Sequence, residues 1–316
     1  MRLHKDRQAF EVIVEKASRL SGVRRDVLEK DYYVTLLLWE LAGLPQQAHA
    51  YFKGGTALYK ALRSIRRFSE DIDLGIYIDD CPTASQEQKR LKNAVLKLKS
   101  LPLKGVLENR RGSLTCEYEY RSLYDIDVDD VLQRYGNVRV EGTSFTVSKP
   151  VEEVEIAPYL FEVSGVEDRE ILRKNYSVEP FMLKTVTLER IFTDKIFAAE
   201  FYYVRRSLFD AAKHIYDLAV LMSDKRINAF LQNKADLRAL IALKRAEEQK
   251  RQGGVPAERN ISAFTYFDAI ADDSEFAKCF ADMQRVYVFA EKDKTELYVV
   301  FDMLQRLRGL IRQAGE

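Results

Sequence analysis

One segment, residues 51–78 (YFKGGTALYKALRSIRRFSEDIDLGIYI), constrains the fold of this chain more than any other. It begins as a short strand that ends at Lys53, continues through Gly54 and Gly55, and enters a helix at Thr56. Paired glycines let a backbone approach a ligand closely, and the N–H groups at a helix N-terminus favour phosphate. Taken alone, the glycine pair also fits an ordinary strand-to-helix turn capped by Thr56.

The second half of this segment alternates polar and apolar residues, as a half-buried strand does. The alternation places Ser69, Asp71, Asp73 and Gly75 on one face and Ile72, Leu74, Ile76 and Ile78 on the other. Neighbouring carboxylates repel unless a cation lies between them or one is protonated. Mg²⁺ prefers oxygen ligands and shares its shell with substrate phosphates. Asp71 and Asp73 are therefore candidate Mg²⁺ ligands, and with the glycine turn they predict a phosphoryl-transfer site. For the aspartate pair alone, a solvated strand face is the alternative.

Two other acidic stretches compete for the metal. In VEEVEIAPYL, Glu153 and Glu155 share a face, and Glu155 is the candidate third metal ligand, with a solvated strand face as the alternative. The run Asp125–Asp130 also alternates acidic and aliphatic residues. No glycine turn precedes it, so we expect an exposed acidic edge or loop.

The pattern along the chain predicts an α+β protein. Residues 8–44 have helical periodicity, and so does the sequence from Phe181 onward, whereas the stretch between them is rich in short β-type runs. The candidate strands are Tyr51–Phe52, Ile72–Ile78, Leu114–Tyr120, Val138–Val140, Phe145–Val147 and Val154–Ile156, with a helical insertion near Gln86–Leu101. We expect N-terminal helices over 1–44, a mixed-sheet core over 45–175 and a C-terminal helical domain over 176–316.

Composition excludes several classes of protein. With 50 Lys+Arg against 49 Asp+Glu the chain is not a uniformly basic nucleic-acid coat, although a local basic face is compatible with this balance. Cys81, Cys116 and Cys279 are scattered, which excludes a disulfide framework and a zinc spacing. The most apolar stretch, Tyr32–Trp39, is too short to span a bilayer and too far along the chain for a secretory signal. We therefore expect no membrane partner and a cytoplasmic location.

The motifs K-G-G-T-A-L at Lys53–Leu58 and R-F-S-E-D-I-D-L at Arg67–Leu74 resemble those of the AbiEii/AbiGii toxin family of nucleotidyltransferases. This family is a branch of the DNA polymerase β-like superfamily. Asp194-Lys195 is similar to its third motif, an E-K-like pair on a helix. Lys213–Leu218 is similar to its fourth, R-D-x-Y-D-L, although His214 stands where the family has a carboxylate. The resemblance covers residues 45–225.

This resemblance implies a nucleotidyltransferase-like mixed β-sheet core and a set of site residues. The implied nucleotide-binding residues are Lys53, Gly54, Gly55, Thr56, Ser69 and Arg67, and the implied catalytic residues are Asp71, Asp73, Lys195 and Asp217. Lys195 would place a positive charge on the phosphates as pyrophosphate leaves, and Asp217 would orient Lys195 or help to activate the acceptor. The alternatives are a surface ion pair for Lys195 with Asp217 and a surface position for Arg67 beside Arg66.

The implied function is that of a nucleotidyltransferase toxin of a bacterial toxin–antitoxin system. It would use Mg²⁺ to transfer nucleotides from an NTP to an acceptor, with tRNA as the leading choice, releasing pyrophosphate; a cognate antitoxin would be its partner. Basic residues crowd residues 89–111, namely Lys89, Arg90, Lys92, Lys97, Lys99, Lys104, Arg110 and Arg111, and would suit RNA. A solvated helix face is the alternative for them, as it is for Arg306, Arg308 and Arg312. The competing functions are a nucleotide-binding interaction protein without transfer activity and a transferase acting on a protein or small molecule.

Overall fold

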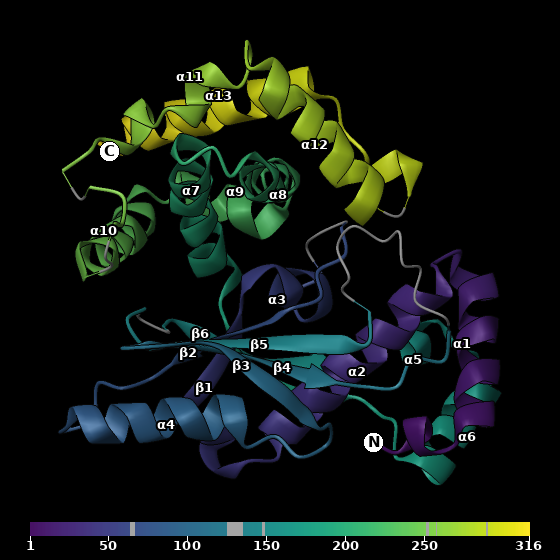
Figure 1. The fold of residues 1–316 in the computed structure, drawn as a ribbon. Coiled ribbons are helices and arrows are strands. Elements are labelled where there is room, and N and C mark those ends of the chain that lie inside the picture. Colours follow the sequence, from purple (N-terminus) through teal and green to yellow (C-terminus); the bar gives the residue numbers. More distant parts are fainter. Residues whose placement is uncertain (64–66, 125–134, 147–148, 251–252, 257, 289) are drawn as a thin grey trace. The chain divides into compact units, whose positions relative to one another are not determined.

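In a computed structural model the chain forms two compact units (Figure 1). Unit 1 comprises Met1–Ala61 and Glu70–Thr185, and unit 2 comprises Leu62–Ser69 and Val186–Glu316. The structure describes residues 1–316 except 64–66, 125–134, 147–148, 251–252, 257 and 289. The division differs from the three predicted segments, because the N-terminal helices belong with the sheet and the short segment Leu62–Ser69 belongs with the C-terminal helices.

Unit 1 is built on a mixed sheet of seven strands in the order β3-β4-β5-β2-β1-β7-β6. The strands are β1 Ala50–Lys53, β2 Ile72–Ile76, β3 Leu103–Arg110, β4 Ser113–Glu119, β5 Asn137–Thr143, β6 Val151–Ile156 and β7 Phe181–Val186. Strand β2 runs antiparallel to β1 and parallel to β5. The two motif strands therefore lie at the centre of the sheet.

The two faces of this sheet carry different groups. One is covered by α4 (Ala84–Leu96), because a Cβ at Gly142 of β5 would lie 2.5 Å from Cγ2 of Val95 (Figure 1). Side chains alternate along a strand, so Glu141 points to the other face. Register pairs Glu141 with Asp73 of β2, and Asp73 with Lys53 of β1. We call the face that carries Lys53, Asp73 and Glu141 the acidic face and the opposite one the α4 face.

Helices complete unit 1 around this sheet. They are α1 Arg7–Ser21, α2 Arg25–Ala42, α3 Gly54–Lys60, α4 Ala84–Leu96, α5 Tyr159–Val163 and α6 Val166–Tyr176, with 3₁₀ turns η1 Leu3–Lys5 and η2 Pro45–His49. Helix α1 shows why such segments are helical. The Asp6 carboxylate accepts a hydrogen bond from the Ala9 N–H at its start, and Gly22 ends it in the left-handed conformation (φ 72°).

Unit 2 is helical. Its elements are α7 Leu188–Val204, α8 Leu208–Leu221, α9 Lys225–Gln232, α10 Lys234–Lys250, α11 Tyr266–Ala269, α12 Ser274–Tyr287 and α13 Leu297–Gln313, with 3₁₀ turns η3 Ile261–Ala263 and η4 Glu291–Asp293. The predicted apolar stripe of α7 is buried, as at Ile191 and Ile196, and α7 packs against α8. Two helices with buried apolar stripes thus form the core of this unit.

The α+β prediction is confirmed, with three local corrections. Phe181–Val186 is not helical but forms β7, which runs parallel to β1 and pairs with it at Thr185. Phe145 and Thr146 are bends rather than strand, and Val147 lies outside the described residues. Strand β3 and helices α5 and α6 were not predicted. β3 is an edge strand, and its mostly exposed residues lack the alternation that marks a half-buried strand.

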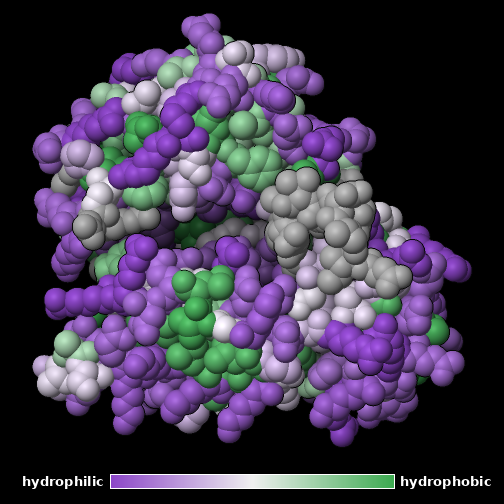
Figure 2. Space-filling model, in the orientation of Figure 1, coloured by the Kyte–Doolittle hydropathy of each residue, from purple (hydrophilic) through white to green (hydrophobic). Residues whose placement is uncertain are grey.

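The surface is largely hydrophilic in the view of Figure 2, with a hydrophobic area where unit 1 is drawn. Some large apolar side chains are exposed on β3, among them Leu103, Val106 and Leu107. Among the helices of the described residues, none has the length and apolar character needed to cross a membrane.

The contact between Gly142 and α4 predicts a stability effect. We expect Gly142→Ala to lower the free energy of unfolding by about 1–3 kcal/mol, because the new Cβ would overlap Val95 and Leu91. Gly105→Ala in β3 is the matched control, since a Cβ there has no neighbour within 4 Å. Urea unfolding followed by circular dichroism measures both variants. Equal midpoints would show that α4 does not press on this strand.

Candidate functional site

The glycine turn lies directly against the acidic strand. Lys53, the last residue of β1, is the register partner of Asp73 on β2, and Gly54 follows with φ +81°. A Cβ at Gly54 would lie 2.0 Å from Oδ2 of Asp73. Both the positive φ and the lack of space require glycine here. The two predicted motifs thus meet at one point of the acidic face.

Thr56 ties the turn to the other aspartate. The side chain of Thr56 is fully buried, and its hydroxyl donates a hydrogen bond of 2.5 Å to the carbonyl oxygen of Asp71. Asp71 directly precedes β2, and its side chain is half-buried. The predicted role of Thr56 in nucleotide binding stays a prediction. Its hydroxyl hydrogen bond indicates that it positions Asp71, while Gly55 lies buried beside it at the start of α3.

A row of polar residues crosses the acidic face of three central strands. Lys53, Asp73 and Glu141 are successive register partners and all are half-buried. The Lys53 ammonium reaches across to β5, where it donates a hydrogen bond of 2.9 Å to Oγ1 of Thr143. Gly75 of β2 lies between Tyr51 and Thr143 in register. We call Lys53, Asp73 and Glu141 the charged row.

Glu155 is not part of this arrangement, and its assignment as third metal ligand is corrected here. It is exposed on β6, the edge strand, and β1 and β7 separate β6 from β2. At about 4.8 Å per strand, β6 lies roughly 14 Å from β2, too far for one ion to bind both. The rival acidic run Asp125–Asp130 falls outside the described residues.

Glu141 is the acid that sequence reasoning missed. The predicted strand Val138–Val140 stopped one residue short of it, whereas β5 continues to Thr143. The sequence did carry a signal, the alternation of Val138 and Val140 with Arg139 and Glu141. Both valines are fully buried, so Arg139 and Glu141 share the opposite face. Only the pairing of β5 with β2, which the sequence does not state, places this residue beside Asp73.

The donor set suits a hard divalent cation that is completed by a substrate. Among the described residues no group of three or more His, Cys, Asp or Glu side chains could enclose a metal ion. Mg²⁺ is usually bound by one or two carboxylates together with substrate phosphates and water. Asp71 and Asp73 supply such carboxylates, and Gly54 leaves the space beside Asp73 free of a side chain. The residues therefore fit Mg²⁺ bound with a nucleotide.

Ser69 and Arg67 belong to unit 2, not to the strand. β2 begins at Ile72, so the alternation that predicted a shared face does not extend to Ser69. Arg67 is only 4% exposed, which rules out the surface position. Its Nε and Nη2 donate hydrogen bonds of 2.6 and 2.8 Å to the two carboxylate oxygens of Asp217, and Nη1 donates to the carbonyl of Phe68. All three guanidinium nitrogens are thus engaged within unit 2.

Asp217 holds a second cation as well. Nζ of Lys195 on α7 lies 2.9 Å from Oδ2 of Asp217 on α8, and both side chains are buried. Burial alone would raise the pKa of Asp217, but the charges of Arg67 and Lys195 outweigh it and keep this pKa below its ordinary value. The surface ion pair considered for Lys195 is therefore a buried triad, in which Asp217 contacts both cations, and its role in orienting Lys195 stays a prediction.

The neighbouring motif residues have separate partners. Asp194 lies 2.8 Å from Nη1 of Arg190 and 3.6 Å from Nζ of Lys244, in a second, largely buried cluster of charges. In the fourth motif Lys213 pairs with Asp210 at 3.1 Å, and the ring of His214 stacks on Tyr202. These contacts of Lys213 and His214 are therefore not with Arg67, Lys195 or Asp217.

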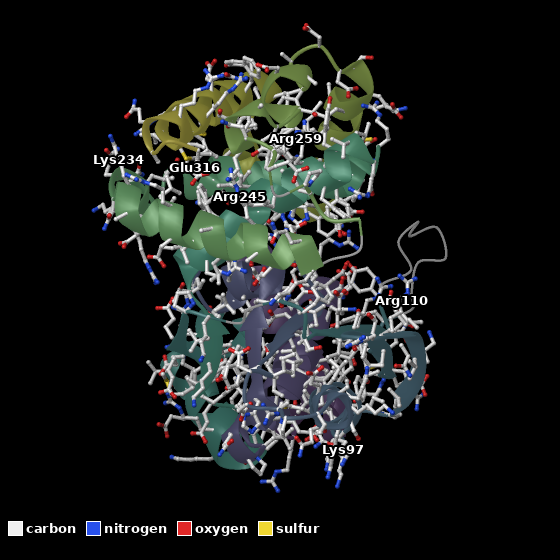
Figure 3. All side chains as sticks on the ribbon, turned by 90° about the vertical axis from the view of Figure 1, so that its left-hand side faces the viewer. Lys97, Arg110, Lys234, Arg245, Arg259 and Glu316 are labelled. Atoms are coloured by element: carbon white, nitrogen blue, oxygen red, sulfur yellow. The ribbon has the colours of Figure 1, made fainter. Side chains whose placement is uncertain are left out.

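The basic residues of 89–111 do not form one stripe. Lys97 follows α4, whereas Arg110 ends β3, and Figure 3 shows them well apart on unit 1. Lys104 and Arg110 lie 3.6 and 3.5 Å from Glu117 and Glu108, respectively. Of the C-terminal cluster, Arg308 pairs with Asp268.

Comparison with known proteins places this chain in a family. The sequence model described as "Nucleotidyl transferase AbiEii toxin, Type IV TA system" matches residues 36–298. No curated protein matches the chain significantly. Among solved structures, MenT4, a nucleotidyltransferase toxin from Mycobacterium tuberculosis H37Rv, is similar with 18% sequence identity and a TM-score of 0.48, over 93% of this chain and 98% of that chain.

The buried triad predicts a pH-dependent contribution to stability. Because the folded pKa of Asp217 is below its ordinary value of 3.8, its stabilisation is present at neutral pH and is lost as the pH falls through the folded pKa. We expect Asp217→Asn to lower the free energy of unfolding by about 3–5 kcal/mol at neutral pH, because two buried cations lose their partner. The deficit should shrink below about pH 4.

The control for this prediction is Asp210→Asn, which removes an exposed carboxylate on the same helix and should change stability by less than about 1 kcal/mol. Urea unfolding at a series of pH values measures both variants. A constant deficit for Asp217→Asn down to the most acid pH would contradict the assignment of a charged Asp217.

Proposed function

The chain belongs to the AbiEii family of nucleotidyltransferase toxins of type IV toxin–antitoxin systems, and from this premise we propose that it transfers nucleotides from an NTP to RNA at the charged row of unit 1. The observation that carries this proposal is the contact of Gly54 with Asp73. It brings a side-chain-free backbone to the carboxylate of Asp73, two residues after Asp71, as the approach of a triphosphate and its metal ion requires.

The residues of unit 1 have distinct proposed roles. Asp71 and Asp73 would hold Mg²⁺ with the substrate phosphates, and Glu141, the register partner of Asp73, would support the site from β5 without being a ligand. Gly54 and Gly55 present their backbone to the phosphates, and Lys53 adds a positive charge beside Asp73. The hydroxyl of Thr56 keeps Asp71 in place by donating to the backbone carbonyl of Asp71. When bound, Mg²⁺ supplies charge neutralisation on the phosphates and activation of the attacking oxygen.

The residues of unit 2 supply positive charge. Lys195 stabilises the charge that develops as pyrophosphate leaves, and Asp217 fixes the position of its ammonium. Arg67 acts as a positioning residue, because its guanidinium nitrogens are already bound to Asp217 and Phe68. Ser69, two residues farther on, is the candidate for a hydrogen bond to a phosphate oxygen.

The acceptor and partners complete the proposal. A type IV toxin implies an antitoxin, which we propose as the cognate protein partner. For the acceptor we propose tRNA. Both NTP and tRNA are abundant in the cytoplasm, where we place the reaction.

The test is incubation of the purified protein with each labelled NTP, Mg²⁺ and total RNA. Label in a tRNA-sized band supports the proposal and names the base. Label in protein or in a small molecule indicates a transferase with another acceptor. No incorporation of any NTP favours an interaction protein without transfer activity.

Loss of a carboxylate should remove activity without unfolding the protein. We expect Asp71→Ala to reduce transfer by about 10³-fold or more and to relieve growth inhibition, because a metal ligand is lost. Asp79→Ala, which removes an exposed aspartate beyond the strand, is the control and should keep full activity. Transfer assays and thermal melting measure both. Wild-type transfer by folded Asp71→Ala would show that the metal assignment is wrong.

The third acid can be tested by a matched pair of variants. We expect Glu141→Gln to lower the transfer rate by about 10–100-fold, as loss of a group that supports a metal site does. Glu155→Gln makes the same chemical change on β6 and should leave the rate unchanged. Initial rates over a range of Mg²⁺ concentrations distinguish the two. A loss of rate in Glu155→Gln but not in Glu141→Gln would favour Glu155 on β6 as a metal ligand.

A further inference from the structure

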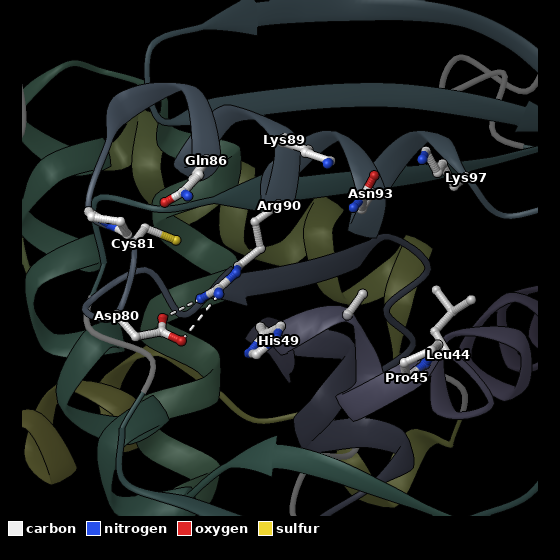
Figure 4. A pocket seen from close by; sticks show the side chains of 12 residues that line it. Leu44, Pro45, His49, Asp80, Cys81, Gln86, Lys89, Arg90, Asn93 and Lys97 are labelled. Carbon is white, nitrogen blue, oxygen red and sulfur yellow. Dashed lines mark hydrogen bonds and ion pairs between the residues drawn. The ribbon is translucent and has the colours of Figure 1, made fainter.

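A concave site lies in unit 1, on the α4 face of the sheet and so opposite the charged row. It is a cavity of about 570 Å³ between η2 and α4 (Figure 4). Leu44, Pro45 and Ala48 form an apolar wall, and α4 with the residue after it supplies Lys89, Asn93 and Lys97 on the other side. This size is in the range of small-ligand sites, and mixed apolar and cationic walls suit an anion that carries a flat apolar part.

The apolar wall is held by an unusual backbone. Residues 46–49, which are Gln46, Gln47, Ala48 and His49, all have positive φ between 49° and 56°. Such conformations are unfavourable for L-residues by about 1–2 kcal/mol each and persist only where the surroundings enforce them.

Here the buried side chain of Gln47 supplies that constraint. Its Nε2 donates to the carbonyls of Ala50 and Lys184 at 2.6 and 2.9 Å, and its Oε1 accepts from the Lys184 N–H at 2.8 Å. The amide thus fixes the turn to β1 and β7. The turn therefore presents His49 and Ala48 to the cavity as a rigid surface.

The positive charges of the cavity are available to a ligand. Within the described residues, Lys89, Asn93 and Lys97 have no side-chain hydrogen bond or ion pair, whereas Arg90 pairs with Asp80 and donates to the Tyr77 carbonyl at 2.7 Å. Lys89, Asn93 and Lys97 follow one another at helical spacing of four residues, so their side chains form a line. The line is about 12 Å long at 1.5 Å per residue, which spans more than one phosphate of a nucleic-acid strand.

His49 adds a flat ring at the inner side. Burial, followed by the charge of Arg90, keeps the pKa of His49 below its ordinary value, so the imidazole is neutral at neutral pH. A neutral ring can stack on a nucleobase, and the amide of Asn93 offers both a donor and an acceptor to a base edge.

We propose that the cavity between η2 and α4 binds a short single-stranded stretch of RNA, with its phosphates on Lys89 and Lys97 and a base stacked on His49 beside Leu44 and Pro45. Because the α4 face is opposite the charged row, this is a separate site and not part of the nucleotide site. That the bound strand belongs to the acceptor rests on the proposed function; the binding itself does not.

The experiment is fluorescence anisotropy of a labelled single-stranded RNA oligonucleotide at several salt concentrations, without NTP. Single strands lose about 0.7 in the slope of log affinity against log salt for each phosphate contact removed. We expect the double variant K89Q/K97Q to bind more weakly and to reduce this slope by about 1.4. The matched control is K92Q/K99Q, whose two exposed lysines do not line the cavity and whose slope should stay near the wild-type value.

A third variant tests the base. We expect His49→Asn to weaken RNA binding by about tenfold through lost stacking, and asparagine tolerates the positive φ. A poly-glutamate peptide serves as a polyanion without bases. The proposal is overturned if K92Q/K99Q reduces the slope as much as K89Q/K97Q, or if the peptide competes as well as RNA and His49→Asn has no effect. The latter result would indicate an acidic protein segment as the ligand.

The outcomes for this site and for the transfer reaction can be separated. Wild-type protein that binds RNA through Lys89 and Lys97 but incorporates no nucleotide contradicts the proposed function and leaves this inference standing. If the wild type labels RNA and the K89Q/K97Q variant binds RNA as well as the wild type does, this inference alone is contradicted.

Discussion

The close approach of Gly54 to Asp73 is the constraint on which the site of unit 1 depends. A side chain at Gly54 would collide with the carboxylate, and the positive φ of this residue turns the chain from β1 directly into α3. The turn therefore stays next to the acidic strand, and Thr56 is brought to the carbonyl of Asp71. A single glycine thus links the backbone that suits phosphate to the carboxylates that suit a metal ion.

A second constraint organises unit 2. A fully buried Asp217 accepts hydrogen bonds from Arg67 and lies within 2.9 Å of the Lys195 ammonium. Breaking a buried pair is costly, so the three residues are expected to keep their geometry. Arg67 comes from Leu62–Ser69, the stretch that immediately precedes the acidic strand in sequence, and the same stretch donates the Phe68 N–H to the Tyr287 carbonyl at 2.8 Å. Arg67 and Phe68 are therefore anchored to α8 and α12.

Periodicity predicted those parts of the fold whose signal is local. The alternation of Ile72, Asp73 and Leu74 fixes the faces of β2, and the apolar stripe of α7 fixes its buried side. Strand order is not local, so the sequence did not separate Glu155 from Asp73 or bring Glu141 to it. Likewise, the motif pattern indicated Arg67, Lys195 and Asp217 individually, but only tertiary packing joins them in a buried triad.

The central claim is that Asp73, whose carboxylate lies against Gly54, holds a divalent ion together with Asp71 and a nucleotide. Electron paramagnetic resonance of Mn²⁺, titrated into the protein with a non-hydrolysable NTP analogue, tests it directly. Wild-type protein should bind Mn²⁺ saturably and only with the analogue present, Asp73→Asn should lose this binding, and Glu155→Gln should retain it. Undiminished Mn²⁺ binding by folded Asp73→Asn would contradict the account.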